Sequence, residues 1–153
     1  MEEKTGIVKT IYPDRCTARV AFEDEEDLLS DELQIVVRGS LKNKAYWMPK
    51  VGEHVFCSFT KQGKGYILGS IYSEEDKPPV IDEGKRHITF EDGTTVEYDT
   101  KTHTLSIQSN GSININAAGN INVTGDVVAD GISLKNHTHT ETGATTSKPI
   151  GGG

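Results

Sequence analysis

The first half of the chain alternates short runs of β-branched and aromatic residues with polar, turn-forming segments. Runs of this kind, bounded by Gly, Pro, Asp and Ser, are typical of β-strands. No segment carries the long apolar period of an amphipathic helix. The pattern therefore predicts an all-β fold that begins with a small five-stranded barrel, with strands at residues 6–12, 16–22, 33–38, 54–60 and 66–72.

The second half repeats a pattern of eight residues. The clearest octads read THTLSIQS, NGSININA and AGNINVTG, followed by a weaker DVVADGIS. Each contains an apolar-x-apolar pair of strand period flanked by small polar residues. Two similar pairs at 88–90 and 96–98 flank the turn signal at 91–93. A repeat this short predicts a β-helix or β-solenoid, whose apolar positions are Leu105, Ile107, Ile113, Ile115, Ile121 and Val123.

A single copy of the repeat has little means of burying these aliphatic side chains. Their burial would contribute about 10–20 kcal/mol, whereas ordering about 24 residues costs roughly 35 kcal/mol. Such thin strands would also leave their edges open. Several identical chains wound about a common axis would solve both problems, so we expect an obligate homo-oligomer. The alternative is a single-chain solenoid, which would have a very small core.

Composition divides the chain near the rigid pair Pro78-Pro79. The large side chains lie mostly before this pair, and charged residues become scarce after residue 102. We therefore expect a first domain at 1–79, connecting strands at 80–102, the octad repeat at 103–134 and a tip at 135–153.

Charge and cysteine content narrow the class of protein. Lys and Arg number 16 against 23 Asp and Glu, a net charge of −7. Phosphate neutralisation needs clustered Lys and Arg, so we expect no nucleic-acid partner. The acidic segment 23–32 is expected to be a solvated loop, with a contact to a basic partner as the alternative. Cys16 and Cys57 fall in apolar runs and are expected to be free, buried thiols.

The chain shows no sign of export or of membrane insertion. No apolar run approaches the ~20 residues that a membrane helix needs. The acidic start lacks the basic-then-apolar order of a secretory signal. We therefore expect synthesis and assembly in the cytoplasm.

Two of the five histidines, His137 and His139, follow the last octad in the segment LKNHTHTETG. In an extended chain this i, i+2 spacing places both imidazoles on one side. Two nitrogen ligands are too few for a stable metal site, so an ion would have to be shared between copies. Three copies would bring six imidazoles, which suit octahedral Fe(II), Ni(II) or Co(II), and two copies would bring four, which suit zinc. The alternative is a solvated pair in a polar tail.

These motifs together resemble the phage baseplate assembly protein V family, the central spikes of contractile tails and tailocins. The resemblance covers WMPKVGEHVFCSF, GYILGSIY, HITFEDGTTVEYD, the octads and the terminal NHTH, which span nearly the whole chain. It implies an OB-fold-like barrel that docks on the baseplate hub or tail tube protein, an intertwined trimeric β-helix and a small metal-bound tip. It also implies one iron ion, Fe2+, per homotrimer, held by His137 and His139 of three chains. Some relatives carry an inserted lysozyme-like domain, for which the segment between Tyr72 and Ile88 leaves no room.

The function implied by this resemblance is mechanical, not enzymatic. We expect a spike in a virion tail baseplate or tailocin particle that caps the tube and hub and pierces the bacterial outer envelope on sheath contraction. One alternative is a peripheral receptor-binding fibre or adhesin, and another is an OB-fold nucleic-acid binder. A third is a mononuclear iron enzyme, in which Glu141 would supply the carboxylate beside two histidines.

Overall fold

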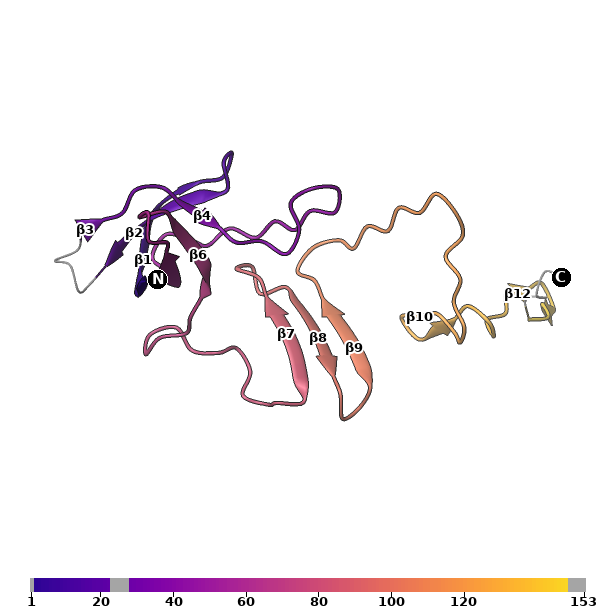
Figure 1. Cartoon of the computed structure of the whole chain (residues 1–153). Coiled ribbons are helices and arrows are strands. Elements are labelled where there is room, and N and C mark those ends of the chain that lie inside the picture. Colours follow the sequence, from indigo (N-terminus) through magenta and orange to yellow (C-terminus); the bar gives the residue numbers. More distant parts are fainter. Residues whose placement is uncertain (1, 23–27, 149–153) are drawn as a thin grey trace. The chain divides into compact units, whose positions relative to one another are not determined.

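The computed structural model describes residues 2–22 and 28–148, coloured along the chain in Figure 1. Within these ranges all regular secondary structure is β-strand and no helix is present, which confirms the all-β class. The same ranges accordingly hold no helix long and apolar enough to cross a membrane. The chain divides into two compact units, Met1–Gln108 and Ser109–Gly153. The domain boundaries expected at 79, 102 and 134 stay predictions.

The first unit begins with a closed β-barrel. Its strands are β1 (Glu2–Tyr12), β2 (Thr17–Phe22), β4 (Leu33–Ile35), β5 (His54–Phe59) and β6 (Gly65–Ser70). The order around the barrel is β1-β5-β6-β4-β2, and β2 pairs back with β1. All of these pairings are antiparallel except β4 with β6, which is parallel. The five-stranded barrel predicted from the apolar runs is therefore confirmed.

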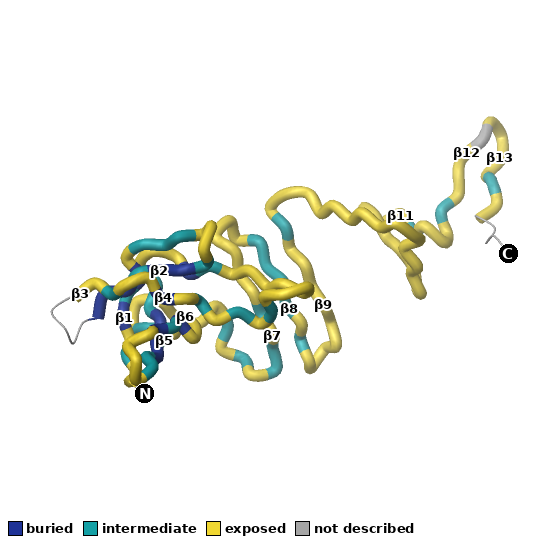
Figure 2. The backbone as a smooth tube through the Cα atoms, turned by 45° about the horizontal axis from the view of Figure 1, so that its top comes forward, coloured by how far each residue is buried: buried dark blue, intermediate teal, exposed yellow. Residues whose placement is uncertain are grey.

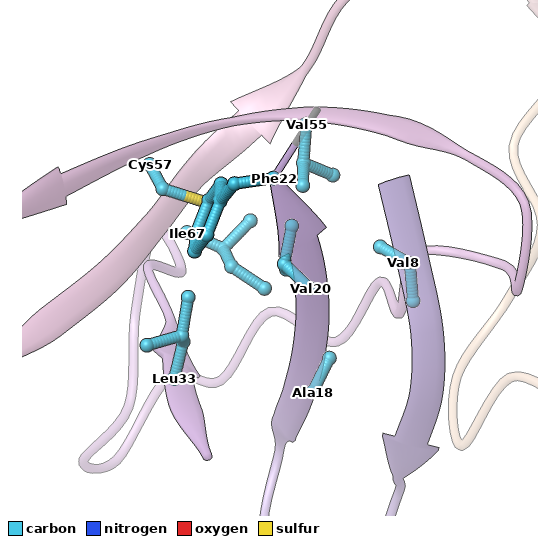
Figure 3. Close-up of a cluster of buried hydrophobic side chains, with 8 residues drawn as sticks. All are labelled: Val8, Ala18, Val20, Phe22, Leu33, Val55, Cys57 and Ile67. Carbon is cyan, nitrogen blue, oxygen red and sulfur yellow. The ribbon is translucent and has the colours of Figure 1, made fainter. Parts of the chain in front are cut away.

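The barrel is filled by the inward positions of its strands. Alternate residues of a strand point to opposite faces, so Val8, Ala18, Val20, Val55 and Cys57 are completely buried. Figure 3 shows these side chains converging between the strands, where they are joined by Phe22, Leu33 and Ile67. This cluster is the main apolar core of the described residues.

Cys16 differs from the prediction in both its position and its burial. Cys16 is not part of β2 but ends the turn that follows Tyr12, with a φ of 53° and only partial burial. A tight turn from Pro13 onward explains this, because it requires one residue in the left-handed region before the next strand begins. Both cysteines are free thiols, as expected, but of the two only Cys57 is buried.

The acidic segment is only partly a loop. Its residues 23–27 lie outside the described part of the chain. The two that follow form β3 (Leu28–Leu29), a short strand on the edge of β2, where their side chains stay outside the core. Farther on, Glu32 accepts hydrogen bonds from the Arg15 guanidinium and the Thr17 hydroxyl. The Arg15 bonds, followed by the Thr17 bond, lower the pKa of Glu32.

A three-stranded antiparallel sheet follows the barrel within the first unit. It consists of β7 (Lys85–Thr89), β8 (Thr95–Asp99) and β9 (Thr104–Gln108). The turn between β7 and β8 uses Gly93 at a φ of 82°, as the turn signal predicted. On one face Glu97 joins Lys85 and His87 at 2.7 and 2.8 Å. The opposite face carries Ile88, Val96, Tyr98, Leu105 and Ile107, and most of these apolar side chains are exposed.

The second unit has little pairing within the chain. Its strands are two short hairpins: β10 (Val128–Ala129) with β11 (Ile132–Ser133), and β12 (Thr140–Glu141) with β13 (Ala144–Thr145). Residues 109–127 have no regular structure, although they contain the second and third octads. A strand needs hydrogen-bonded neighbours, and no strand pairing joins these two octads to the rest of the described chain. Pairing of these octads in a β-helix therefore stays a prediction.

The aliphatic side chains of the octads are exposed throughout. Figure 2 shows the tube coloured as exposed along most of the chain after β8. The exposed fractions are 63% for Leu105, 54% for Ile107, 59% for Ile113, 69% for Ile115, 61% for Ile121 and 55% for Val123. The apolar side chains that recur every eight residues are thus left exposed by the rest of the described chain.

Candidate metal-binding tip

The segment before the histidine pair is a tight β-hairpin. Strands β10 and β11 are joined by Asp130 and Gly131, whose φ angles of 48° and 81° are both positive. Two successive positive φ angles define the type I′ turn, for which Asp-Gly is a favoured pair. One further bond extends the hairpin, from the Leu134 amide to the Val127 carbonyl at 2.8 Å. The local sequence therefore fixes the position of the residues that follow.

Asp126 fastens the open end of this hairpin. Its Oδ1 accepts hydrogen bonds from the amides of Val127 at 2.8 Å and Lys135 at 3.1 Å, and its Oδ2 accepts from the Ser133 hydroxyl. The Ser133 bond, followed by the Lys135 amide, lowers the pKa of Asp126. The carboxylate thus joins the residue that precedes β10 to β11 and to the residues that follow it.

His137 is attached to the same hairpin through its backbone and its ring. Its amide donates to the Ser133 carbonyl at 3.0 Å. Its Nδ1 lies 3.1 Å from the Ser133 carbonyl oxygen and 3.0 Å from that of Leu134. Carbonyl oxygens only accept, so Nδ1 carries the proton and the lone pair of the neutral ring is on Nε2. His137 therefore presents the ring atom that a metal ion would bind.

His139 is held from the other side, by the chain that follows the last hairpin. Its amide donates to the Thr146 hydroxyl at 2.7 Å, and the Thr146 amide donates to the His139 carbonyl at 2.8 Å. The two imidazole rings lie 5.2 Å apart between centroids, in an edge-to-face arrangement. The pair predicted from the i, i+2 spacing is thus brought together in one chain.

A polar chain of contacts links the tail to the loop between the hairpins. The Lys148 ammonium lies 3.0 Å from the Asn136 side-chain oxygen, and the Asn136 amide group donates to the Ser133 hydroxyl at 3.1 Å. These contacts leave His137 and His139 between two anchored segments. The expected tip extends to residue 153, and its residues 149–153 lie outside the described part of the chain.

One chain alone does not assemble a complete metal site in the region that the structure describes. No group of three or more His, Cys, Asp or Glu side chains is positioned there to hold an ion. The side chain of Glu141, which the iron-enzyme alternative requires, lies outside that region. The available donor set per chain is therefore two imidazoles, which fits an ion shared between symmetry-related copies.

Sequence reasoning found the histidines but missed their support. The Asp-Gly pair within DVVADGIS is a strong hairpin signal, and it could have placed β10 and β11. Nothing in the sequence indicates that Asp126 binds Ser133, because that contact depends on the register of the hairpin in three dimensions.

Comparison with known proteins adds independent information. No family model matches this sequence. The chain is 26% identical over 129 residues to the protein described as "Spike protein" from Escherichia phage P2. The match covers 82% of this chain and 59% of that protein, so the chain spans little more than half the length of its relative. This chain is therefore similar to a phage spike protein.

Proposed function

We propose that this chain is a central spike at the tip of a contractile phage tail or tailocin. Three copies form it, and it caps the hub and tube and penetrates the bacterial envelope when the sheath contracts. The observation that carries the proposal is the line of exposed aliphatic side chains at eight-residue intervals, which a single chain leaves in water.

The exposed register calls for a partner with the same repeat. Leu105, Ile113 and Ile121 recur at equal spacing, as do Ile107, Ile115 and Val123. Long exposed apolar surfaces mark sites of interaction. A partner that covers every octad equally must itself repeat every eight residues, and a second and third copy of this chain meet that condition. Such winding would also give strand neighbours to residues 109–127, which form no regular strand in the described chain.

The sheet of β7, β8 and β9 supports the same arrangement. Its polar face is held by the Lys85–Glu97–His87 contacts, whereas its apolar face holds exposed Ile88 and Tyr98. In a folded protein the apolar face of a sheet is normally the covered one. Assembly of three such sheets with these faces inward would cover the exposed apolar side chains.

With three copies, as the resemblance implies, the histidine pair would make a complete octahedral site. Three chains would bring six imidazoles to a common axis, with His137 and His139 of each chain as the ligands. Six nitrogen donors suit octahedral Fe(II), and the Nε2 lone pair of His137 is directed by its Nδ1 bonds. An iron ion so bound would supply cross-linking of the three chains at the apex and no open position for catalysis.

The barrel is the proposed attachment to the hub or tail tube. It exposes several large apolar side chains that its own core does not use, among them Leu41, Tyr46, Trp47, Val51 and Tyr72. Exposed aromatic and aliphatic groups of this kind are typical of protein contact surfaces. No nucleic acid is proposed as a partner.

Electron microscopy of intact particles tests the assignment. A spike would place this chain on the tail axis, directly beyond the end of the tube. Finding it at the periphery of the baseplate would contradict the proposal and favour the fibre or adhesin alternative.

The role of the tip is tested by the double variant His137→Ala/His139→Ala, with Thr138→Ser as the matched control between them. We expect particles that carry the double variant to lack iron and to kill or infect less per assembled particle. Particles that carry the control should keep their iron and their native activity. Fully active particles that lack iron and retain a sharp tip would show that the ion is dispensable.

A further inference from the structure

We propose that Asp126 is a positioning residue for the metal site: by fastening the β10–β11 hairpin it places the carbonyl groups that hold the Nδ1 proton of His137, so that Nε2 faces the ion. This inference rests on the proposed function, because the ring orientation gains a use only when a metal is shared at the tip. It concerns residues other than the ligands themselves.

The first step is the lock at the base of the hairpin. Asp126 bonds to the amides of Val127 and Lys135, which lie on opposite sides of the hairpin, and to the Ser133 hydroxyl. Bonds that involve an ionised carboxylate are roughly twice as strong as neutral ones. Asp126 therefore restrains the separation of the two hairpin ends and the rotation of the Ser133 side chain.

The second step runs from Ser133 to the histidine ring. The Ser133 hydroxyl, which donates to Asp126, accepts from the Asn136 amide at 2.9 Å and from the Asn136 side chain at 3.1 Å. The turn this closes brings the Ser133 and Leu134 carbonyls to 3.1 and 3.0 Å from Nδ1 of His137. The ring is thus held by two carbonyl acceptors whose positions depend on the hydrogen bonds between Asp126 and the hairpin.

The third step is chemical. A ligating imidazole is oriented, and its basicity raised, by the hydrogen bond that its other nitrogen donates. Here the donating nitrogen is Nδ1 and the acceptors are backbone carbonyls. Loss of such an outer contact lowers metal affinity by about 10- to 100-fold in metal sites generally. The same loss would let the proton of neutral His137 move between Nδ1 and Nε2.

The test compares Asp126→Asn with Asp130→Asn in the full-length oligomer. Both changes remove one carboxylate from the same hairpin. Asp130 occupies the positive-φ turn position, where Asn is equally suited. In Asp126→Asn, by contrast, an NH2 group replaces one of the two accepting oxygens. In one orientation it faces the amides of Val127 and Lys135, which are donors, and in the other it faces a Ser133 hydroxyl that already accepts two bonds from Asn136.

Two measurements are made on protein stripped of metal with a chelator. Long-range proton–nitrogen NMR on histidine-labelled protein at mildly alkaline pH reports which ring nitrogen of His137 carries the proton. Anaerobic titration with Co2+, followed by its absorption, reports metal affinity. We expect the proton on Nδ1 in the native protein and in Asp130→Asn. For Asp126→Asn we expect a mixture of tautomers and a loss of affinity of about 10- to 100-fold.

The outcomes separate this inference from the proposed function. A proton found on Nε2 in the native protein would overturn the inference, as would a native tautomer and native affinity in Asp126→Asn, even if Co2+ still binds. A native protein that binds no Co2+ would overturn the metal-bound tip, while the tautomer of the metal-free variants would still decide the role of Asp126. If Asp126→Asn does not assemble, Ser133→Ala breaks the same lock and carries the same expectations.

Discussion

Replacing two octad isoleucines should dissociate the assembly without harming the barrel. We consider Ile113→Ser/Ile121→Ser, which removes the first apolar position of two successive octads. Complete burial of an isoleucine is worth about 1.5–3 kcal/mol. In one chain 59% and 61% of these side chains remain exposed, so association can gain about 1–2 kcal/mol from each.

A trimer contains six such side chains, so the double variant should lose about 5–11 kcal/mol of association free energy. At about 1.4 kcal/mol per factor of ten, this corresponds to roughly four to eight powers of ten in the assembly constant. The matched control is Asn114→Ser/Asn122→Ser, which introduces the same residue on the alternate face of the same octads.

Sedimentation velocity across micromolar concentrations measures the effect. We expect the isoleucine variant to sediment as a smaller species and the asparagine variant to keep the native assembly. Equal assembly of both variants would refute the reasoning, because it would show that the exposed aliphatic register is not the contact between copies.

Three further predictions concern the first unit. Burial raises the pKa of Cys57 to about 11, so alkylation of this thiol at pH 8, followed by mass spectrometry, should require unfolding; rapid labelling of the folded protein would contradict this. The Lys85 ammonium, followed by a neighbouring imidazole, lowers the pKa of Glu97, so its contribution to stability is present above the ordinary glutamate pKa and is lost as pH falls through the lowered one. The stability difference between native protein and Glu97→Gln in urea denaturation should therefore shrink in acid, and a difference that grows there would be the wrong sign. Ile67→Ala should destabilise the barrel by about 2–5 kcal/mol, whereas Leu68→Ala, at a side chain 47% exposed, should cost clearly less; equal costs would mean that the core is misplaced.

The barrel was predictable because its signal is local. Runs of β-branched and aromatic residues mark strands wherever the chain packs against itself, and the inward positions Val8, Val20 and Val55 follow the alternation of those runs. The misplaced start of the second strand has an equally local cause. The turn from Pro13 places Cys16 at a positive φ, and a count of apolar residues does not register that constraint.

The eight-residue repeat of the second unit was predictable from the sequence, but the pairing of its strands was not. The octad register is plain in the sequence, yet within the described chain the second and third octads form no paired strand, whereas the first contributes β9 and the fourth the β10–β11 hairpin. The spacing of His137 and His139 identified the candidate site. The lock at Asp126 was hidden because its partner Ser133 is brought to it by a hairpin that closes between them.

Molar mass in solution, measured by light scattering together with metal content, tests the central claim most directly. The account predicts a particle of about 50 kDa, three times the 16.7 kDa of one chain, with one iron ion in each. A well-folded 16.7 kDa species at micromolar concentration would contradict it, because the apolar side chains of the octads would then be stable in water without partners.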